Sequence, residues 1–299
     1  MTFRGDLNSS GRQVSTGGGG RGRVVAGGGI GTLILVGAFL LLGGNPADLG
    51  PLLGQDSSSG QQLPAGADDG TALQEKCQTG ADANKHDDCR VYFTASSLDR
   101  VWGAELEKQA HIRYTEPDLT IFEQQVNTGC GMASSSTGPF YCPQDSTAYF
   151  DTSFFSQISQ LGGKNAPFAQ EYIVAHEFGH HIQNLEGTLG LSNYNQPGAE
   201  SNAVKIELQA DCYAGVWAHF ADKGPDADLE PVTDEQVRDA VSTARAVGDD
   251  NIQKRSSGSV RPDQFTHGSS DQRQEAFLAG YKSGKMAACD TLDRGGYSQ

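Results

Sequence analysis

The strongest chemical signal in the chain is a run of five residues, His176-Glu177-Phe178-Gly179-His180. On a helix, two histidines four residues apart project from one side, one turn from each other. Both can then bind a single Zn²⁺, and the glutamate beside the first histidine is placed to act on water at the metal. We therefore expect His176 and His180 to be metal ligands and Glu177 to be the general base.

Apolar residues recur at helical spacing on both sides of this motif. Residues 168–185 contain no proline, and Tyr172, Ala175, Gly179 and Ile182 fall on one stripe. Gly187 follows as a stop signal. The pattern predicts a buried or half-buried helix that lines a cleft.

A catalytic zinc site needs a third protein ligand and one open position. The best candidate is Glu207, 27 residues after His180, within a second predicted helix over residues 201–220. Asp211 lies one turn further on the same side, where it can accept a hydrogen bond from the outer N–H of a ligand histidine. Small residues recur nearby, at Ala210, Ala214 and Gly215. They indicate a close approach of two helices. The alternative for Glu207 is that it is an ordinary surface glutamate.

These motifs resemble those of the gluzincin metallopeptidases, and the chain is most similar to the bacterial putative neutral zinc metallopeptidase family. The matching stretches are residues 17–44, 128–131, 138–143, 175–183, 207–215, 248–250, 265–270 and 289–291. The resemblance implies a membrane-linked zinc peptidase with Zn²⁺ as cofactor and a peptide or protein as substrate. It also implies that the strand at Thr147–Asp151 pairs with an extended substrate, although a plain core strand is equally compatible with the sequence.

A second electrophile beside the metal usually helps to stabilise the negative oxygen that forms during hydrolysis. Our candidate is His267, in a Gly/Ser turn before a predicted helix over residues 271–283. Ser269 and Gln272 have the spacing of a capping box at the start of that helix. A histidine that only stabilises the loop is the alternative.

The amino-terminal part predicts a membrane anchor. Residues 1–23 are Gly/Ser-rich and are expected to form a disordered cytoplasmic tail, with four arginines against one aspartate. Residues 24–44 lack charge and are long enough, at about 1.5 Å per residue, to cross a bilayer core of about 30 Å. The arginine asymmetry predicts a single-pass protein of the cell membrane with its catalytic domain outside the cytoplasm. A cleaved signal peptide is the alternative.

The remaining boundaries follow from composition. Residues 45–76 read as a flexible linker, residues 77–291 as the zinc metallopeptidase domain, and residues 292–299 as a flexible tail. Six cysteines lie beyond the apolar segment, and proximity favours Cys77 with Cys89 and Cys130 with Cys142, which leaves Cys212 for Cys289. Six cysteines allow 15 pairings, and free thiols in a cytosolic protein are the alternative.

Charge limits the class of partner. The formal net charge is −15, and residues after 23 carry −18 because the first 23 carry +3. A strongly acidic domain is repelled by phosphate groups, so we expect no nucleic-acid partner. The sequence does not determine the oligomeric state.

The expected fold class is α+β, with a small β-sheet beside a helical bundle, zinc held between two helices, and one amino-terminal transmembrane helix. The other expected helices cover residues 97–110, 151–161 and 234–247, and the strands cover residues 119–126 and 147–150. His86 and His111 have no partner at ligand spacing, and Asp249 and Asp250 read as caps. His181 points about 100° away from the second ligand and is expected to be a packed helix residue, and His219 is expected to be structural as well. Two other functions stay open: a binding or scaffold protein without turnover, and a zinc amidase that acts on cell-wall peptides.

Overall fold

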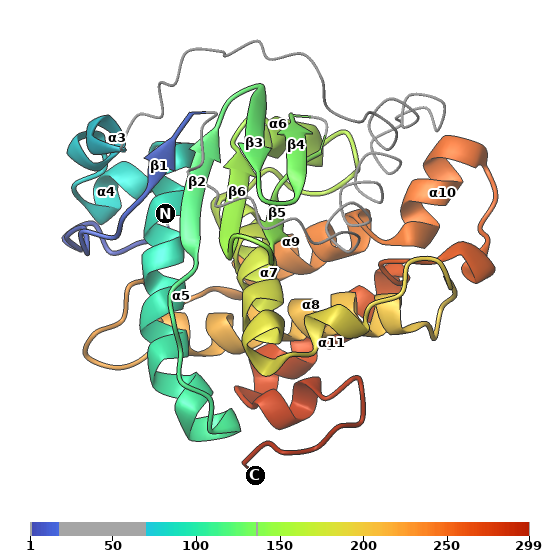
Figure 1. Ribbon diagram of the computed structural model, residues 1–299. Coiled ribbons are helices and arrows are strands. Elements are labelled where there is room, and N and C mark those ends of the chain that lie inside the picture. Colours follow the sequence, from blue (N-terminus) through green and yellow to red (C-terminus); the bar gives the residue numbers. More distant parts are fainter. Residues whose placement is uncertain (1, 18–69, 136, 299) are drawn as a thin grey trace.

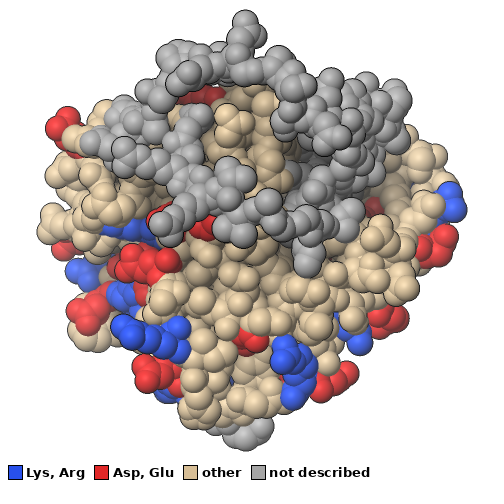
Figure 2. Space-filling model, viewed as in Figure 1, with Lys and Arg blue, Asp and Glu red and all other residues tan. Residues whose placement is uncertain are grey.

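The computed structural model describes residues 2–17, 70–135 and 137–298. In these residues a small β-sheet lies beside a group of helices (Figure 1). The α+β content predicted from the sequence is therefore confirmed. Basic and acidic side chains are interspersed on the face shown in Figure 2.

The main sheet has four strands in the order β1-β2-β6-β5. Its members are β1 (Ser15–Thr16), β2 (Asp118–Phe122), β5 (Phe140–Cys142) and β6 (Thr147–Asp151). β1 and β6 run parallel to β2, whereas β5 runs antiparallel to β6. The prediction that residues 147–151 form a substrate-binding edge is therefore wrong, because β6 already has a neighbour on each side. β5 lies at the edge of the sheet instead. A separate hairpin joins β3 (Gln125–Thr128) to β4 (Gly131–Ser134).

Five longer helices pack beside the sheet: α5 (Asp87–Ala110), α7 (Pro167–Glu186), α8 (Asn202–Ala221), α9 (Asp234–Ala246) and α11 (Ser270–Ser283). The shorter ones are α3 (Thr71–Lys76), α4 (Gly80–Ala83), α6 (Phe154–Ile158) and α10 (Asp249–Ser257). Single 3-10 turns occupy Leu189–Leu191, Pro262–Gln264 and Met286–Cys289.

Local sequence signals set the ends of the helices that matter for the site. α7 begins with Pro167 at its first position and ends at Gly187, whose φ of 71° suits a residue without a Cβ. α8 begins at Ser201, whose hydroxyl accepts a hydrogen bond from the Val204 backbone N–H. α11 begins with the predicted capping box of Ser269 and Gln272.

Other boundaries differ from the sequence prediction. α5 starts ten residues before the predicted position 97, and α6 is shorter than the predicted helix over residues 151–161. The predicted strand over residues 119–126 breaks after Phe122, because Gln124 has a positive φ of 69°. The carboxy-terminal residues are packed and not a free tail, since the Tyr297 hydroxyl donates to Glu186 Oε1 at 2.9 Å.

The amino-terminal segment corrects the prediction of a disordered tail. Phe3 and Val14 are only 1% and 3% exposed, and β1 adds to the sheet beside β2. The Arg12 guanidinium donates to the Pro117 carbonyl oxygen at 2.7 Å and lies 2.8 Å from the Asp99 carboxylate. A few apolar and charged side chains thus fix residues 2–17 on the domain, although their composition is rich in glycine and serine.

The predicted transmembrane helix is not supported. Within residues 2–17, 70–135 and 137–298, none of the helices is long and apolar enough to cross a membrane. Residues 24–44, where the crossing was predicted, lie outside the described residues, as does the predicted linker up to residue 69.

Three disulfides join the six cysteines in the pairs that proximity favoured. They are Cys77–Cys89, Cys130–Cys142 and Cys212–Cys289. The third pair ties α8 to the 3-10 turn near the carboxy terminus.

The two helices that carry the predicted ligands approach each other closely at Gly179. A Cβ placed on Gly179 would lie 2.9 Å from the backbone of Ala210 in α8. A larger residue inside the motif would therefore push α7 away from α8. Ala210, one of the small residues noted in the sequence, lies at this close contact.

Candidate metal centre

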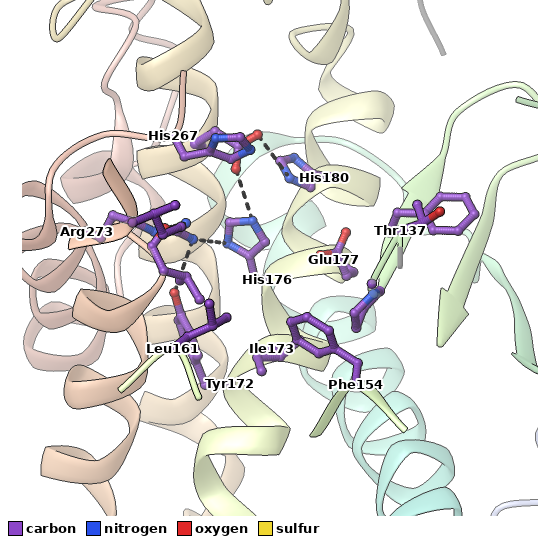
Figure 3. Close-up of a pocket in the computed structure, with 16 residues that line it drawn as sticks. Thr137, Phe154, Leu161, Tyr172, Ile173, His176, Glu177, His180, His267 and Arg273 are labelled. Atoms are coloured by element: carbon purple, nitrogen blue, oxygen red, sulfur yellow. Dashed lines mark hydrogen bonds and ion pairs between the residues drawn. The ribbon is translucent and has the colours of Figure 1, made fainter. Parts of the chain in front are cut away.

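α7 and α8 bring the three predicted ligands together at one end of a pocket (Figure 3). His176 Nε2 lies 3.3 Å from Glu207 Oε2, and His180 Nε2 lies 3.8 Å from Glu207 Oε1. All three side chains are buried, and their ligand atoms lie within 4.8 Å of one another. The arrangement is therefore a possible three-ligand metal site.

The spacing of these atoms fits a tetrahedral zinc ion. Zinc binds histidine nitrogen and carboxylate oxygen at about 2.1 Å, so two ligands of a tetrahedron lie about 3.4 Å apart. The two nitrogen–oxygen distances, 3.3 and 3.8 Å, are close to that value. Two imidazoles and one carboxylate are also a donor set that zinc uses in hydrolases.

The electrostatics of the cluster favour a cation. Burial opposes protonation of His176, but the Asp211 and Glu207 carboxylates outweigh it and raise the pKa of His176 to about 10. Burial also opposes ionisation of Glu207, yet the nearby histidines 267, 180 and 176 hold the pKa of Glu207 well below its usual range. The buried carboxylates thus favour positive charge at this site, and a divalent cation would supply it.

A buried network orients His176. Its Nδ1 lies 2.8 Å from Asp211 Oδ1, so the N–H donates there and Nε2 is left for the metal. Arg273 donates to both Asp211 oxygens, at 2.8 and 2.9 Å, and the Tyr172 hydroxyl donates to Oδ1. Asp211 therefore has the position that its spacing from Glu207 indicated.

Sequence reasoning missed Arg273 and the hydroxyl of Tyr172. Tyr172 lies four residues before His176, so a signal was present at helical spacing. Arg273 comes from α11, which is far along the chain from His176 and Asp211, so no helical spacing connects it to them.

His180 has its own support. Its Nδ1 donates to Gln183 Oε1 at 2.8 Å, and the Gln183 amide in turn donates to the Ile206 carbonyl oxygen at 2.7 Å. Ile206 precedes the third ligand directly, so this chain of bonds links the second ligand to the backbone that carries Glu207.

Glu177 lies in the same pocket and is 8% exposed. Burial raises the pKa of Glu177 to about 7, with smaller and opposing effects of His176 and Glu207. A carboxylate with a pKa near neutrality is well suited to accept and return a proton at neutral pH.

His267 reaches the pocket from the opposite side, on the loop before α11 (Figure 3). Asp249 Oδ2 accepts hydrogen bonds from three successive backbone N–H groups, those of Thr266, His267 and Gly268, at 2.7, 2.7 and 3.0 Å. The Thr266 hydroxyl lies 2.9 Å from His267 Nδ1, and Asp249 Oδ1 lies 3.5 Å from it. Burial opposes protonation of His267, but Glu207 and Asp249 outweigh it, so its pKa is raised.

From the sequence, Asp249 was interpreted as a helix cap, but it has a further role. It fixes the loop that carries His267. Gly248 permits this contact, because a Cβ there would lie 2.5 Å from the Ser270 backbone nitrogen.

Tyr194 is a further residue that the sequence did not single out. It lies between α7 and α8, and its hydroxyl donates to Glu207 Oε1 at 2.9 Å. The bond holds the carboxylate of the third ligand. No spacing rule connects a loop tyrosine to a glutamate 13 residues later.

The remaining histidines on these helices have structural partners. His181 Nε2 donates to the Thr115 carbonyl oxygen at 2.7 Å, and its Nδ1 lies 3.0 Å from the Tyr141 hydroxyl. His219 Nδ1 donates to the Tyr281 carbonyl oxygen at 2.8 Å. Both agree with the interpretation of these residues as packed histidines.

Comparison with known proteins agrees with this site. A family model described as "Putative neutral zinc metallopeptidase" matches residues 4–292, and the match begins within the packed amino-terminal segment. The chain is 49% identical over 223 residues to the uncharacterised Mycobacterium tuberculosis protein Rv2575, which covers 73% of this chain and 74% of that protein. It is 38% identical over 228 residues to the uncharacterised Escherichia coli protein YpfJ, and this match covers 73% of this chain and 76% of that protein. No solved structure matches. The description of the family implies zinc as the metal.

Proposed function

This chain belongs to the family described as putative neutral zinc metallopeptidases, and we propose that it is a zinc-dependent peptidase that hydrolyses peptide bonds. The observation that carries the proposal is the convergence of His176, His180 and Glu207 in one pocket with Glu177. A binding protein on the same frame would not need a buried glutamate with a pKa near neutrality beside the ligands.

The three ligands would hold zinc, which when bound polarises the scissile carbonyl and activates water. The protein supplies the rest. Asp211 and Gln183 hold the two ligand histidines in the tautomer that leaves each Nε2 free. Glu177 accepts the proton of the attacking water and passes it to the leaving amine.

His267 is positioned to donate a hydrogen bond to the oxygen that becomes negative during attack. Among the described residues its Nε2 has no hydrogen-bond partner, while its Nδ1 lies near Thr266 and Asp249. The raised pKa of His267 favours the protonated form, which has an N–H on Nε2. The free Nε2 and the place of His267 in the pocket support this proposal for the residue.

β5 is the strand that we propose for substrate binding. Phe140, the first residue of this strand, lines the pocket together with Gly138 and Pro139, which precede the strand. Within the described part of the chain, β5 pairs with β6 and with no other strand. An extended peptide could add to its outer edge by backbone hydrogen bonds, which would lay a scissile bond across the ligands.

Three disulfides also lead us to propose that the domain works in an oxidising compartment outside the cytoplasm. Blocking thiols in intact cells, followed by non-reducing peptide mapping, tests this proposal. We expect the three pairs to be oxidised, and six alkylated cysteines would refute it.

The test of activity compares three substrates with the purified protein, namely an unfolded protein, a peptide library and cell-wall fragments. Each is incubated with zinc and with a chelator. We expect peptide-bond cleavage that the chelator abolishes. Glu177→Gln should keep zinc and lose most activity, because Glu177 is not a ligand; normal turnover in this variant at full zinc content would refute the mechanism. Cleavage of cell-wall fragments alone would indicate an amidase instead.

A further inference from the structure

β5 lies between two separate groups of buried apolar side chains. Tyr141, its middle residue, belongs to the main core, and its hydroxyl accepts a hydrogen bond from the Asn184 amide of α7 at 3.0 Å. Phe140 and Cys142 belong instead to a second and smaller cluster. The members of this small cluster are Phe122, Val126, Ala133, Phe140, Cys142 and Tyr149. Successive residues of a strand face opposite sides, so β5 is held on its two faces by different parts of the protein.

The hairpin β3–β4 meets the main sheet through this small cluster. Val126 comes from β3 and Ala133 from β4, and the other members come from β2, β5 and β6. Within the part of the chain that the structure describes, the two strands of the hairpin pair only with each other. A two-stranded hairpin is marginally stable by itself in water, so contacts with the rest of the protein must hold it. The Cys130–Cys142 disulfide supplies a covalent contact, from the turn of the hairpin to the last residue of β5.

The hairpin also fixes the segment that enters β5. The Thr137 backbone N–H donates to the Ser134 carbonyl oxygen at 2.8 Å, and the Thr137 hydroxyl accepts from the Ser134 N–H at 3.1 Å. The residues of this segment that line the pocket are Thr137, Gly138, Pro139 and Phe140. The segment is thus tied to the hairpin at its start, and again just beyond its end by the disulfide at Cys142. An exposed hydrogen bond from the Gly129 N–H to Asp145, at 2.6 Å, is a weaker tie of the hairpin, because water competes for it.

This disulfide is the most accessible of the three. Cys130 is partly exposed, whereas each of the other five cysteines is at most 1% exposed. Access to the sulfur atoms limits the rate of thiol–disulfide exchange, so a reductant reaches this pair first. Opening the bond takes two electrons and two protons, which a dithiol reductant supplies as it closes to its own disulfide.

We propose that the Cys130–Cys142 disulfide holds β5 and residues 137–140 in the position that binds an extended peptide, and that a dithiol reductant lowers the substrate affinity of the site by opening this bond. The inference rests on the proposed peptidase function and names a regulation of that same site. Both cysteines act through the strand, so they are positioning residues. Substrate binding should weaken more than turnover, because Tyr141 still bonds to α7 and keeps β5 near the ligands.

The first test compares two pairs of cysteines in the full-length protein. Replacing Cys130 and Cys142 by alanine removes the proposed tie. Replacing Cys77 and Cys89 by alanine is the matched control, because both disulfides have a sequence separation of 12 and neither Cys77 nor Cys89 lines the pocket. Loops of equal length should lose similar stability, so we expect the melting temperature to fall by about 6–12 °C in both variants.

Substrate binding should distinguish the two variants. Fluorescein-labelled casein serves as an unfolded substrate. The Cys130/Cys142 variant should raise its apparent KM by about 5- to 30-fold, which is the factor for reordering the backbone of one residue on binding. Its kcat should change less than its KM, and its zinc content should equal that of the wild type. An unchanged KM in this variant, or an equal rise in the Cys77/Cys89 variant, would overturn the inference.

A second pair of variants covers the case in which the cysteine variant does not fold. Val126→Ala removes two carbon groups from the small cluster, and Val101→Ala does the same in α5. The two valines are 1% and 2% exposed, and neither lines the pocket. Val126→Ala should raise the apparent KM, whereas Val101→Ala should leave it unchanged. The same KM in both folded variants would contradict the role of the hairpin.

The second test needs no catalysis. Stepwise reduction of the wild-type protein with dithiothreitol, followed by alkylation and peptide mapping, should label Cys130 and Cys142 before the other cysteines. Hydrogen exchange in a peptide that spans residues 137–142 should be faster than wild type in the Cys130/Cys142 variant and unchanged in the Cys77/Cys89 variant. Simultaneous labelling of all the cysteines, or equal exchange in both variants, would refute the proposal.

These outcomes separate the two proposals. If the wild-type protein cleaves no substrate while exchange over residues 137–142 still depends on the Cys130–Cys142 bond, the peptidase function fails and the role of the disulfide in holding the strand stands. If the wild-type protein cleaves casein with a KM that does not depend on this bond, the inference fails and the peptidase function stands.

Discussion

Gly280→Ala should lower the stability of the protein and its affinity for zinc, although Gly280 is not one of the predicted ligands. Gly280 lies in α11 where this helix crosses α8, and a Cβ there would lie 1.9 Å from the Cys212 carbonyl oxygen. Gly215 in α8 faces α11 just as closely, since its Cβ would lie 2.1 Å from the Phe277 carbonyl oxygen. The two helices therefore touch through their backbones.

The size of the effect follows from this distance. Ordinary contact of a Cβ begins at 3.4 Å, so the helices would have to separate by about 1.5 Å. Overpacking alone costs about 1–3 kcal/mol, and backbone atoms cannot rotate out of the way. The same face of α11 carries Arg273, two turns earlier, whose bonds to Asp211 measure 2.8 and 2.9 Å. Weakening a buried ion pair adds to the cost, so we expect about 3–5 kcal/mol of lost stability.

The assay is thermal unfolding together with zinc content. For a domain of this size 1 kcal/mol shifts the melting temperature by about 2–4 °C, so Gly280→Ala should lower it by at least about 6 °C. Zinc affinity should also fall, because Asp211 would no longer hold His176 firmly.

Gly103→Ala is the matched control for this substitution. Gly103 is exposed in α5, and its Cβ would meet only Tyr114 at 4.0 Å. There the usual preference of helices for alanine applies, and stability should rise by about 0.5–1 kcal/mol. A Gly280→Ala protein that melts at or above the wild-type temperature would refute the reasoning.

Three further predictions concern catalysis, pH and redox state. His267→Ala should lower kcat/KM by roughly 10²–10³. Zinc content and melting temperature should change little, because Asp249 holds this loop through backbone N–H groups, which the substitution leaves in place. A lower melting temperature with a proportionate loss of activity would make the residue structural. Burial raises the pKa of Glu171 to about 8 from an ordinary 4.5, so the folded protein keeps a proton that the unfolded chain releases. The free energy of unfolding, measured in urea, should therefore fall between about pH 4.5 and pH 8, and Glu171→Gln should flatten that fall; an equal slope in both proteins would contradict this assignment. Replacing Cys212 and Cys289 by alanine should cost about 4 kcal/mol in the same assay, since their disulfide closes a loop with a sequence separation of 77; a loss below about 1 kcal/mol would contradict that estimate.

The sequence predicted those parts of the site that lie within a helical turn of each other. His176, Glu177 and His180 share one turn of α7, and Glu207 and Asp211 share one turn of α8. Helical periodicity fixes the direction of such side chains relative to one another. The small residues in α8 and the capping box of α11 were also local signals, and both describe the structure correctly.

Periodicity could not reveal partners brought together by tertiary packing. Arg273 reaches Asp211 across 62 positions, and Asp249 holds the His267 loop across 18. The same limit explains the error about residues 147–151, because β5 lies at the edge of the sheet only through its pairing with β6. Strand order depends on which segments pair, and a single strand pattern does not encode that choice.

The amino-terminal segment was misjudged for a related reason. Its composition indicated disorder, yet two of its contacts reach the metal helix. The Thr2 hydroxyl donates to Glu171 Oε1, and the Arg12 guanidinium lies 5.6 Å from the centre of the Phe178 ring, inside the metal-binding motif. α7 is therefore contacted by residues 2–17 as well as by α8.

This support has a consequence for the metal site. From Phe168 to Gln183 every side chain of α7 is buried, so the helix has little freedom to turn or shift. Within α7, only Tyr172, Ile173, His176, Glu177 and His180 line the pocket. A helix enclosed in this way presents its ligands in fixed directions before the metal binds, which lowers the ordering cost of binding. The contacts of residues 2–17 thus belong to the structure that holds the metal ligands in place, although none of these residues lines the pocket.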